Sequence, residues 1–181
     1  MNKLHKNYHC GIDVSKLKFI GKGSQGKVYF LPPDKVIKVF FNDYSFKDQI
    51  HILKCAQESR FFTKIYNYDD DSIIMDYVPG PNLKEYLKNN SLDEKIAFEL
   101  VELIYNFELL GFTRLNIRSP HIFVQADKSI KVIDPRKNFE IVEKYPVSIL
   151  KTLKKFGYLN IFFRLIKNKY PDKYSKWKKL H

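Results

Sequence analysis

The stretch Gly21-Lys22-Gly23-Ser24-Gln25-Gly26-Lys27-Val28 decides the fold of this chain of 181 residues. It spaces three glycines as G-x-G-x-x-G, and apolar residues flank it as Phe19-Ile20 before and Val28-Tyr29-Phe30 after. Apolar β-formers around a glycine-rich turn predict two strands joined by a tight loop. Glycines also let a loop backbone come close to a phosphate. Because the spacing alone fits an ordinary flexible hairpin as well, the motifs that follow decide between the two interpretations.

A lysine interrupts the next apolar run, Val36-Ile37-Lys38-Val39-Phe40. This run follows the turn residues Pro32-Pro33-Asp34 and predicts a third strand. A buried ammonium group is costly without a partner. Apolar residues at helical spacing predict a helix over residues 45–62. We expect Glu58 on this helix to be the partner of Lys38, with Gln57 as the competing register.

The second half of the chain contains two further polar motifs. One is Arg114-Leu115-Asn116-Ile117-Arg118-Ser119-Pro120-His121-Ile122-Phe123-Val124, and the other is Lys131-Val132-Ile133-Asp134-Pro135. Asp134 follows an apolar strand and lies 18 residues after Asn116. A carboxylate at the end of a buried strand suits Mg²⁺, a hard cation that prefers oxygen ligands. An Asp-Pro turn without a ligand is the alternative.

Together these motifs resemble the nucleotide site of the protein kinase family. The glycine loop matches the loop over the ATP phosphates, Lys38 the lysine of V-A-I-K, residues 114–124 the catalytic loop, and Asp134 the aspartate of D-F-G. The resemblance implies an α+β fold with two lobes: a small antiparallel sheet with one helix, and a reduced helical lobe. Since only 47 residues follow Asp134, the resemblance is to minimal kinases such as the RIO type. We expect one kinase-like domain over 1–181, with an N-lobe at 1–78, a hinge at 79–82 and a C-lobe at 83–181.

The resemblance also implies the activity and the residues that bind the nucleotide. We expect an ATP-dependent phosphotransferase similar to serine/threonine protein kinases, with ATP in the cleft between the lobes and a hydroxyl group of a protein or small molecule as acceptor. The expected nucleotide-binding residues are Gly21, Gly23 and Gly26 over the triphosphate, Lys38 with Glu58, the apolar residues Ile20, Val28, Val36, Met75, Phe123 and Ile133 around the adenine, and Asp76 and Val78 at the hinge. An ordinary core role for the apolar residues is compatible with this assignment.

Two catalytic positions depart from the family pattern. Asn116 stands where the catalytic aspartate belongs, and His121 where the metal-binding asparagine belongs. Asn116 cannot accept a proton, and a general base contributes about 10²- to 10⁴-fold in rate. Arg118 keeps the positive charge that the family places beside the transferred phosphate. The expected catalytic set is therefore Asn116, Arg118, His121 and Asp134, and restoring aspartate at position 116 should raise activity.

The same substitutions bear on the metal and on the class of protein. Asp134 and His121 are the expected metal ligands, for Mg²⁺ or, because imidazole suits softer ions, for Mn²⁺. A pseudokinase that binds or scaffolds partners, with weak or no catalysis, is the alternative that Asn116 and His121 favour.

The cellular setting follows from what the sequence lacks. The first 18 residues contain no apolar core of a signal peptide, and no run of 18 apolar residues occurs. Cys10 and Cys55 form neither a disulfide framework nor a metal motif. We expect a cytoplasmic protein without a transmembrane segment.

Positive charge is concentrated at the C-terminal end. Residues 151–181 hold ten Lys and Arg residues against Asp172, so this segment carries +9 of the net charge of +12. Such a field would attract a polyanionic partner, although a solvated helix face is the common explanation of a charge run. Nucleic-acid binding through the interleaved Tyr158, Tyr170, Tyr174 and Trp177, or contact of residues 159–166 with an anionic membrane, are lesser alternatives.

Overall fold

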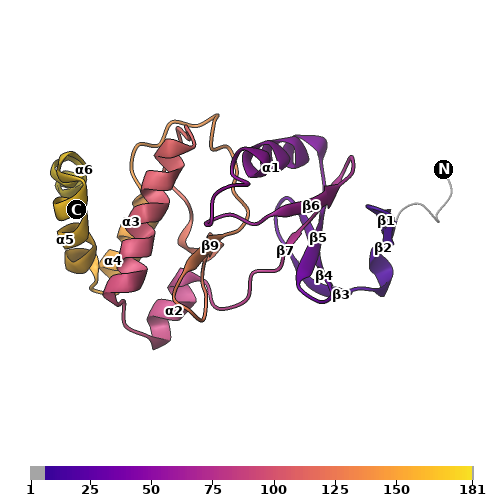
Figure 1. The fold of residues 1–181 in the computed structure, drawn as a ribbon, viewed down its shortest axis with the longest axis horizontal. Helices are drawn as coiled ribbons and strands as arrows, with labels where there is room; N and C mark the ends of the chain where they lie inside the picture. The colour runs from indigo at the N-terminus through magenta and orange to yellow at the C-terminus, as the bar shows by residue number, and fades with distance from the viewer. Residues whose placement is uncertain (1–6, 181) are drawn as a thin grey trace. The chain divides into compact units, whose positions relative to one another are not determined.

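A computed structural model describes residues 7–180 of the chain (Figure 1). Helices and antiparallel strands are both present, so the predicted α+β class is confirmed. The chain divides into two compact units, and the division falls between Val78 and Pro79.

The first unit is built on a five-stranded sheet in the order β3-β4-β5-β7-β6, in which all neighbouring strands are antiparallel. The strands are β3 (Lys18–Lys22), β4 (Gly26–Leu31), β5 (Lys35–Phe40), β6 (Ile65–Tyr68) and β7 (Ser72–Asp76). Three of them, β3, β4 and β5, were predicted from the apolar runs beside the glycine loop and around Lys38. The central strands β5 and β7 hold buried branched residues such as Ile37 and Ile73, which is typical of a strand covered on both faces.

One helix, α1 (Asp43–Cys55), packs against β5. Its first turn is capped by Asn42, whose side-chain oxygen accepts a hydrogen bond from the Ser45 amide at 2.8 Å. The predicted helix over residues 45–62 is too long, because α1 ends at Cys55 and the chain turns there. The Gln57 side chain donates a hydrogen bond to the Leu53 carbonyl at 2.7 Å and so satisfies the last turn of the helix.

A small hairpin that was not predicted precedes the sheet. It consists of β1 (Tyr8–His9) and β2 (Ile12–Asp13), and a 3-10 turn (Val14–Lys16) leads from it into β3. Val14 is buried against Ile37 and Ile74, so the hairpin segment contributes to the core of the first unit.

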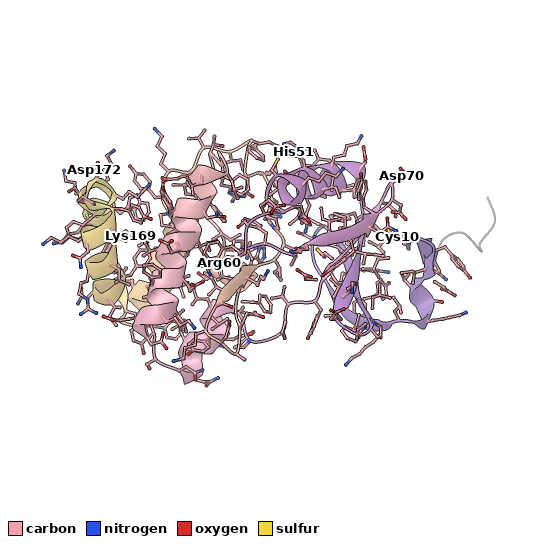
Figure 2. All side chains as sticks on the ribbon, in the orientation of Figure 1. Cys10, His51, Arg60, Asp70, Lys169 and Asp172 are labelled. Carbon is pink, nitrogen blue, oxygen red and sulfur yellow. The ribbon has the colours of Figure 1, made fainter. Side chains whose placement is uncertain are left out.

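Polar contacts attach this hairpin to the β6–β7 turn. The Cys10 amide donates to the Asp69 carboxylate at 2.5 Å, His9 Nδ1 lies 2.7 Å from an Asp71 carboxylate oxygen, and Cys10 Sγ lies 3.2 Å from Ser72 Oγ. Figure 2 shows Cys10 on the same side of the sheet as Asp70, which lies in the β6–β7 turn. Burial raises the pKa of the Cys10 thiol above its ordinary value.

The second unit begins with two helices. Asn82 caps α2 (Leu83–Asn89) by accepting from the Glu85 amide, and Asp93 caps α3 (Glu94–Leu109) by accepting from the Ile96 amide. Helix α3 ends just before Gly111, which has a φ of +72°. Its inward face is fully buried, so α3 is the centre of this unit.

Two short strands and three helices complete the second unit. The strands β8 (Ile122–Val124) and β9 (Ile130–Val132) form an antiparallel hairpin. The helices are α4 (Val147–Lys155), α5 (Leu159–Lys169) and α6 (Pro171–Trp177), followed by a 3-10 turn, Lys178–Leu180. Helix α5 packs against α3, α4 and α6, and the yellow end of the chain lies beside α3 in Figure 1.

Candidate functional site

Lys38 is the most deeply buried charged residue that we describe, with 2% of its surface exposed. It lies on β5 in register with Val28 of β4 and Ile73 of β7. Its ammonium group donates hydrogen bonds to Gln49 Oε1 at 2.6 Å and to Gln25 Oε1 at 3.3 Å. Since Gln25 belongs to the glycine loop, the structure brings Lys38 and this loop together, as the sequence pattern predicts.

The helix residue that meets Lys38 differs from the prediction. Glu58 is exposed and lies beyond the end of α1, while the Gln57 side chain bonds the carbonyls of Leu53 and Thr63. The choice of Glu58, with Gln57 as its competitor, is therefore wrong, and Gln49 takes the position. The reason is geometric: Gln49 faces the sheet from the middle of α1, together with Phe46 and Leu53.

Gln49 is itself unusual because its side chain is completely buried. Its Oε1 accepts from Lys38, but its Nε2 is the one buried side-chain polar atom that has no hydrogen-bond partner within residues 7–180. An unsatisfied buried donor costs about 1–3 kcal/mol. A group at this position that accepts a hydrogen bond would remove this cost.

The three glycines of the loop differ in what the fold requires of them. A Cβ atom on Gly26 would lie 2.2 Å from the Val39 carbonyl oxygen, so packing of β4 on β5 demands glycine there. A Cβ atom on Gly21 or Gly23 would meet nothing within 4 Å, and neither residue has a positive φ. The fold itself therefore gives no reason for glycine at positions 21 and 23.

The residues expected around the adenine in the first unit lie close to one another. Val36 and Met75 are buried and are paired in register between β5 and β7. Ile20 is 44% exposed and lines a shallow hollow together with Phe30 and Tyr77. The first unit thus presents apolar surface, but whether it holds a nucleobase stays a prediction.

The two residues expected at the hinge, Asp76 and Val78, have different surroundings. Val78 is buried at the end of the first unit. The Asp76 carboxylate accepts hydrogen bonds from the Lys64 amide and from the Tyr66 hydroxyl, both at 2.8 Å. Asp76 is thus tied to β6 through its side chain, and its expected contact with a base stays a prediction.

In the second unit the Asn116 side chain both accepts and donates a hydrogen bond. Its Oδ1 accepts from the Ser148 amide at 2.9 Å, and its Nδ2 donates to a Glu143 carboxylate oxygen at 3.2 Å. Ser148 is the second residue of α4, and Pro146 supplies no side-chain cap, so Asn116 caps this helix from a distance. Asn116 thus has a structural role that the sequence pattern did not indicate.

Glu143 joins Asn116 to Arg114 and was also not predicted. Arg114 Nε donates a hydrogen bond to the second carboxylate oxygen of Glu143 at 2.5 Å. Burial alone would raise the pKa of Glu143, but the hydrogen bonds from Arg114 and Asn116, with the charge of Arg114, hold it below its ordinary value of 4.5. No local sequence signal marks Glu143, because the contact joins residues 27 and 29 positions apart.

This shift predicts an acid-dependent loss of stability. A depressed carboxyl pKa contributes stability that is present above the unfolded value and is lost as the pH falls through the folded value. Urea unfolding of the natural chain between pH 6 and pH 3 should therefore show a stability loss that is smaller in Glu143→Gln. If both proteins lose stability equally, Glu143 is not bonded as described.

Asp134 and His121 are close neighbours in the backbone. The Ile133 amide donates to the His121 carbonyl at 2.9 Å, and both side chains line one small hollow with Asn116 and Arg118. Asp134 has a φ of +51°, a left-handed conformation that costs a residue other than glycine about 1–2 kcal/mol. The four expected catalytic residues are therefore brought together, and strained backbone of this kind gathers at functional sites.

Phe123 and Ile133, the remaining residues expected around the adenine, lie on the β8–β9 hairpin and directly after it. Both are partly buried. The backbone of Phe123 bridges that of Asn82, and the side chain of Asn82 serves as the cap of α2. The contact of Phe123 and Ile133 with a base stays a prediction.

Among the described residues the one group of three or more clustered metal-ligand side chains is His9, Asp69 and Asp71, in the first unit. Asp134 and His121 are two potential ligands, and within residues 7–180 they do not belong to a group of three or more such side chains. A carboxylate fits Mg²⁺, which keeps waters and phosphate oxygens in the rest of its shell. The residues present are thus compatible with a metal carried by a nucleotide, and the imidazole would suit Mn²⁺ better.

Part of the basic C-terminal charge is used inside the second unit. Ion pairs join Arg164 to Glu94, Lys169 to Glu102, and Lys173 to Glu108. All three acidic residues lie on α3, and Figure 2 places Lys169 between α5 and α3. These pairs fasten the last helices to α3, which the charge count alone did not show.

The aromatic residues of this segment are also used for packing. Trp177 is 3% exposed, and Tyr170 stacks on Tyr105 of α3 with ring centroids 5.2 Å apart. Burial and then the neighbouring Glu102 raise the pKa of Tyr170 to about 12, so its hydroxyl stays protonated. Trp177 is therefore not available for stacking on nucleobases, which weakens the nucleic-acid alternative.

The chain is distantly similar to a protein kinase. No family model matches it. A probable serine/threonine-protein kinase of Dictyostelium discoideum is 28% identical over 139 residues, which cover 67% of this chain and 9% of that protein. The chain thus spans less than a tenth of the length of this relative. No helix within residues 7–180 has the length and apolar character needed to cross a membrane.

Proposed function

We propose that this protein is an ATP-dependent phosphotransferase of the serine/threonine protein kinase type. The carrying observation is the buried Lys38, whose ammonium reaches the glycine loop through Gln25. A lysine beside such a loop can neutralise and position the phosphates of a nucleotide. Glycine at positions 21 and 23, where packing does not demand it, supports an approach of phosphates to this backbone.

The second unit supplies the groups for the transfer step. Asp134 would hold Mg²⁺ or Mn²⁺, which neutralises charge on the phosphates when bound. Arg118 is exposed and would bring positive charge to the transferred group. His121 can accept a proton near neutral pH, because it is the side chain whose ordinary pKa lies there. The acceptor is a hydroxyl group, and the proposed location is the cytoplasm, supported by the free thiols of Cys10 and Cys55.

A binding module without turnover is the second candidate. It is favoured by Asn116, whose side chain is occupied by Ser148 and Glu143, and by the neutral Gln49 beside Lys38. Phosphoryl transfer rests mainly on positioning and charge stabilisation, so such losses slow the reaction without abolishing it. This candidate would be favoured if the protein binds ATP but forms no ADP with any of the hydroxyl acceptors tested.

Nucleotide titration by calorimetry with Mg²⁺ tests the proposal. We expect Lys38→Met and the double variant Gly21→Ala/Gly23→Ala each to weaken ATP binding by about tenfold or more, since each removes a phosphate contact worth roughly 1.4 kcal/mol or more. The glycine variant should keep the thermal stability of the natural chain, because both methyl groups enter open space.

Gly26→Ala serves as the contrasting control. Its added methyl group clashes with the Val39 carbonyl, so it should lower the free energy of unfolding whether or not ATP is bound. An absence of ATP binding by the natural chain would remove both the enzyme and the nucleotide-binding module. If Gly21→Ala/Gly23→Ala binds ATP as well as the natural chain does, the glycine loop does not meet the phosphates.

A further inference from the structure

The second unit contains a hollow of about 360 Å³ that is separate from the one around Asp134. Buried apolar side chains of Phe112, Leu115 and Trp177 form part of its lining. Val142 also lines it and is 67% exposed. This volume is in the range of ligand sites and accommodates one or two apolar side chains.

Lysines surround this apolar hollow. Lys144, Lys173 and Lys176 line it, with Glu108 as the acidic residue among its lining. Glu108 is already paired with Lys173. Within the described chain neither the Lys144 side chain nor the Lys176 side chain forms an ion pair or hydrogen bond, and both residues are exposed. The hollow therefore offers two uncompensated positive charges beside apolar surface.

The hollow shares a wall with the candidate catalytic residues. Arg114 forms an isolated parallel β-bridge with Glu143, in which the Leu115 amide donates to the Glu143 carbonyl at 2.8 Å and the Glu143 amide to the Thr113 carbonyl at 3.0 Å. Successive side chains of an extended segment point to opposite faces. Accordingly Thr113 and Leu115 line this hollow, whereas Arg114 and Asn116 line the hollow of Asp134.

We propose that this hollow is a docking site for an acidic peptide segment of a partner protein. An aliphatic side chain of the segment enters the hollow beside Val142, and flanking carboxylates pair with Lys144 and Lys176. Charge complementarity selects the occupant, because an anionic segment meets two unpaired cations and a basic one meets repulsion. The concave apolar lining favours a peptide side chain over a phosphate backbone, which needs cations alone.

The site does not depend on nucleotide binding, so it can be tested directly on the full chain. The probe is a fluorescein-labelled peptide, Glu-Glu-Leu-Leu-Glu-Glu. Its binding to the protein is measured by fluorescence anisotropy at 50 mM salt. Two comparison peptides replace both leucines by serine, or all glutamates by lysine. We expect the acidic leucine peptide to bind and both comparison peptides to bind at least tenfold more weakly.

Two matched pairs of lysines separate this site from general attraction to a basic chain. Lys144→Gln/Lys176→Gln should weaken the acidic leucine peptide roughly fivefold or more, the effect of two charge pairs. Lys151→Gln/Lys154→Gln removes the same charge from the exposed face of α4 and should change binding less than twofold. Val142→Asp should abolish binding while leaving the melting temperature unchanged, because Val142 is exposed.

Three results would overturn the proposal. Equal weakening by the two lysine pairs, or equal binding of the serine peptide, would show attraction by net charge alone. Absence of binding of the leucine peptide at millimolar concentration would show that the hollow takes no acidic segment.

Discussion

The paired change Asn116→Asp with Glu143→Gln should raise phosphotransfer from ATP by about 10²- to 10⁴-fold over the natural chain. The first change supplies the proton acceptor that the resemblance to protein kinases places at position 116. The second change, Glu143→Gln, places an amide at position 143, so the carboxylate and the amide that share this hydrogen bond have exchanged positions. Net charge stays the same, and the amide introduced at position 143 can accept from Arg114 while it donates to the new carboxylate at position 116.

The single change Asn116→Asp should gain much less. In the natural chain the Asn116 amide donates to Glu143 at 3.2 Å, so a second carboxylate there would face a like charge. The two acids would then share a proton or move apart, and either outcome removes a ready base. The structure thus revises the expectation that restoring aspartate is sufficient.

Glu143→Gln alone is the matched control. It keeps asparagine at position 116, so we expect activity within a few-fold of the natural chain. The measurement is phosphate transfer from radiolabelled ATP to a mixture of serine and threonine peptides. If the single Asn116→Asp variant is as active as the double variant, the contact with Glu143 does not limit catalysis. If neither gains, position 116 is not that of the base.

The second large effect concerns folding and lies at Gly80. This residue has a φ of +92°, and a Cβ atom on it would lie 2.3 Å from the Val124 carbonyl oxygen. The same short segment is held to the β8 end by the Val124 amide, which donates to the Pro81 carbonyl at 2.9 Å. Gly80→Ala should therefore cost about 3–5 kcal/mol of unfolding free energy, from left-handed strain together with displaced backbone.

Gly111→Ala separates these two contributions. Gly111 has a φ of +72°, but its added Cβ would meet nothing within 4 Å. It should cost only about 1–2 kcal/mol, the strain of a left-handed alanine. Urea unfolding of both variants gives the comparison. Equal losses at the two positions would mean that the approach of Gly80 to Val124 is not as close as described.

Local patterns predicted the regular elements well. Apolar runs next to turn residues indicated β3, β4 and β5, and apolar residues at helical spacing indicated α1. The end of α1 was missed because Phe61 and Phe62 continue the apolar pattern while the chain already turns; both are buried without being helical. Helix α2 carried a signal that was overlooked, an Asn82 cap three residues before Glu85.

The candidate site was predictable where its residues are close in sequence. The glycine loop, Lys38 and residues 114–134 follow motif spacing, and hydrogen bonds and hollows bring them together within each unit. Gln49 was missed because the partner of Lys38 was sought at positions 57 and 58, beyond the end of α1, whereas position 49 shares a helix face with Phe46 and Leu53. Glu143 could not be found, since only tertiary pairing sets it beside Arg114 and Asn116.

The contrast between the two thiols offers a spectroscopic handle. Cys10 is half-buried, hydrogen-bonded near Ser72, and has a raised pKa, so little of it is thiolate at neutral pH. Cys55 is exposed at the last residue of α1. A maleimide dye at pH 7 should therefore attach to Cys55 first. The dye would then sit on the helix whose Gln49 binds Lys38, and would report by fluorescence any movement of that helix when ATP is added.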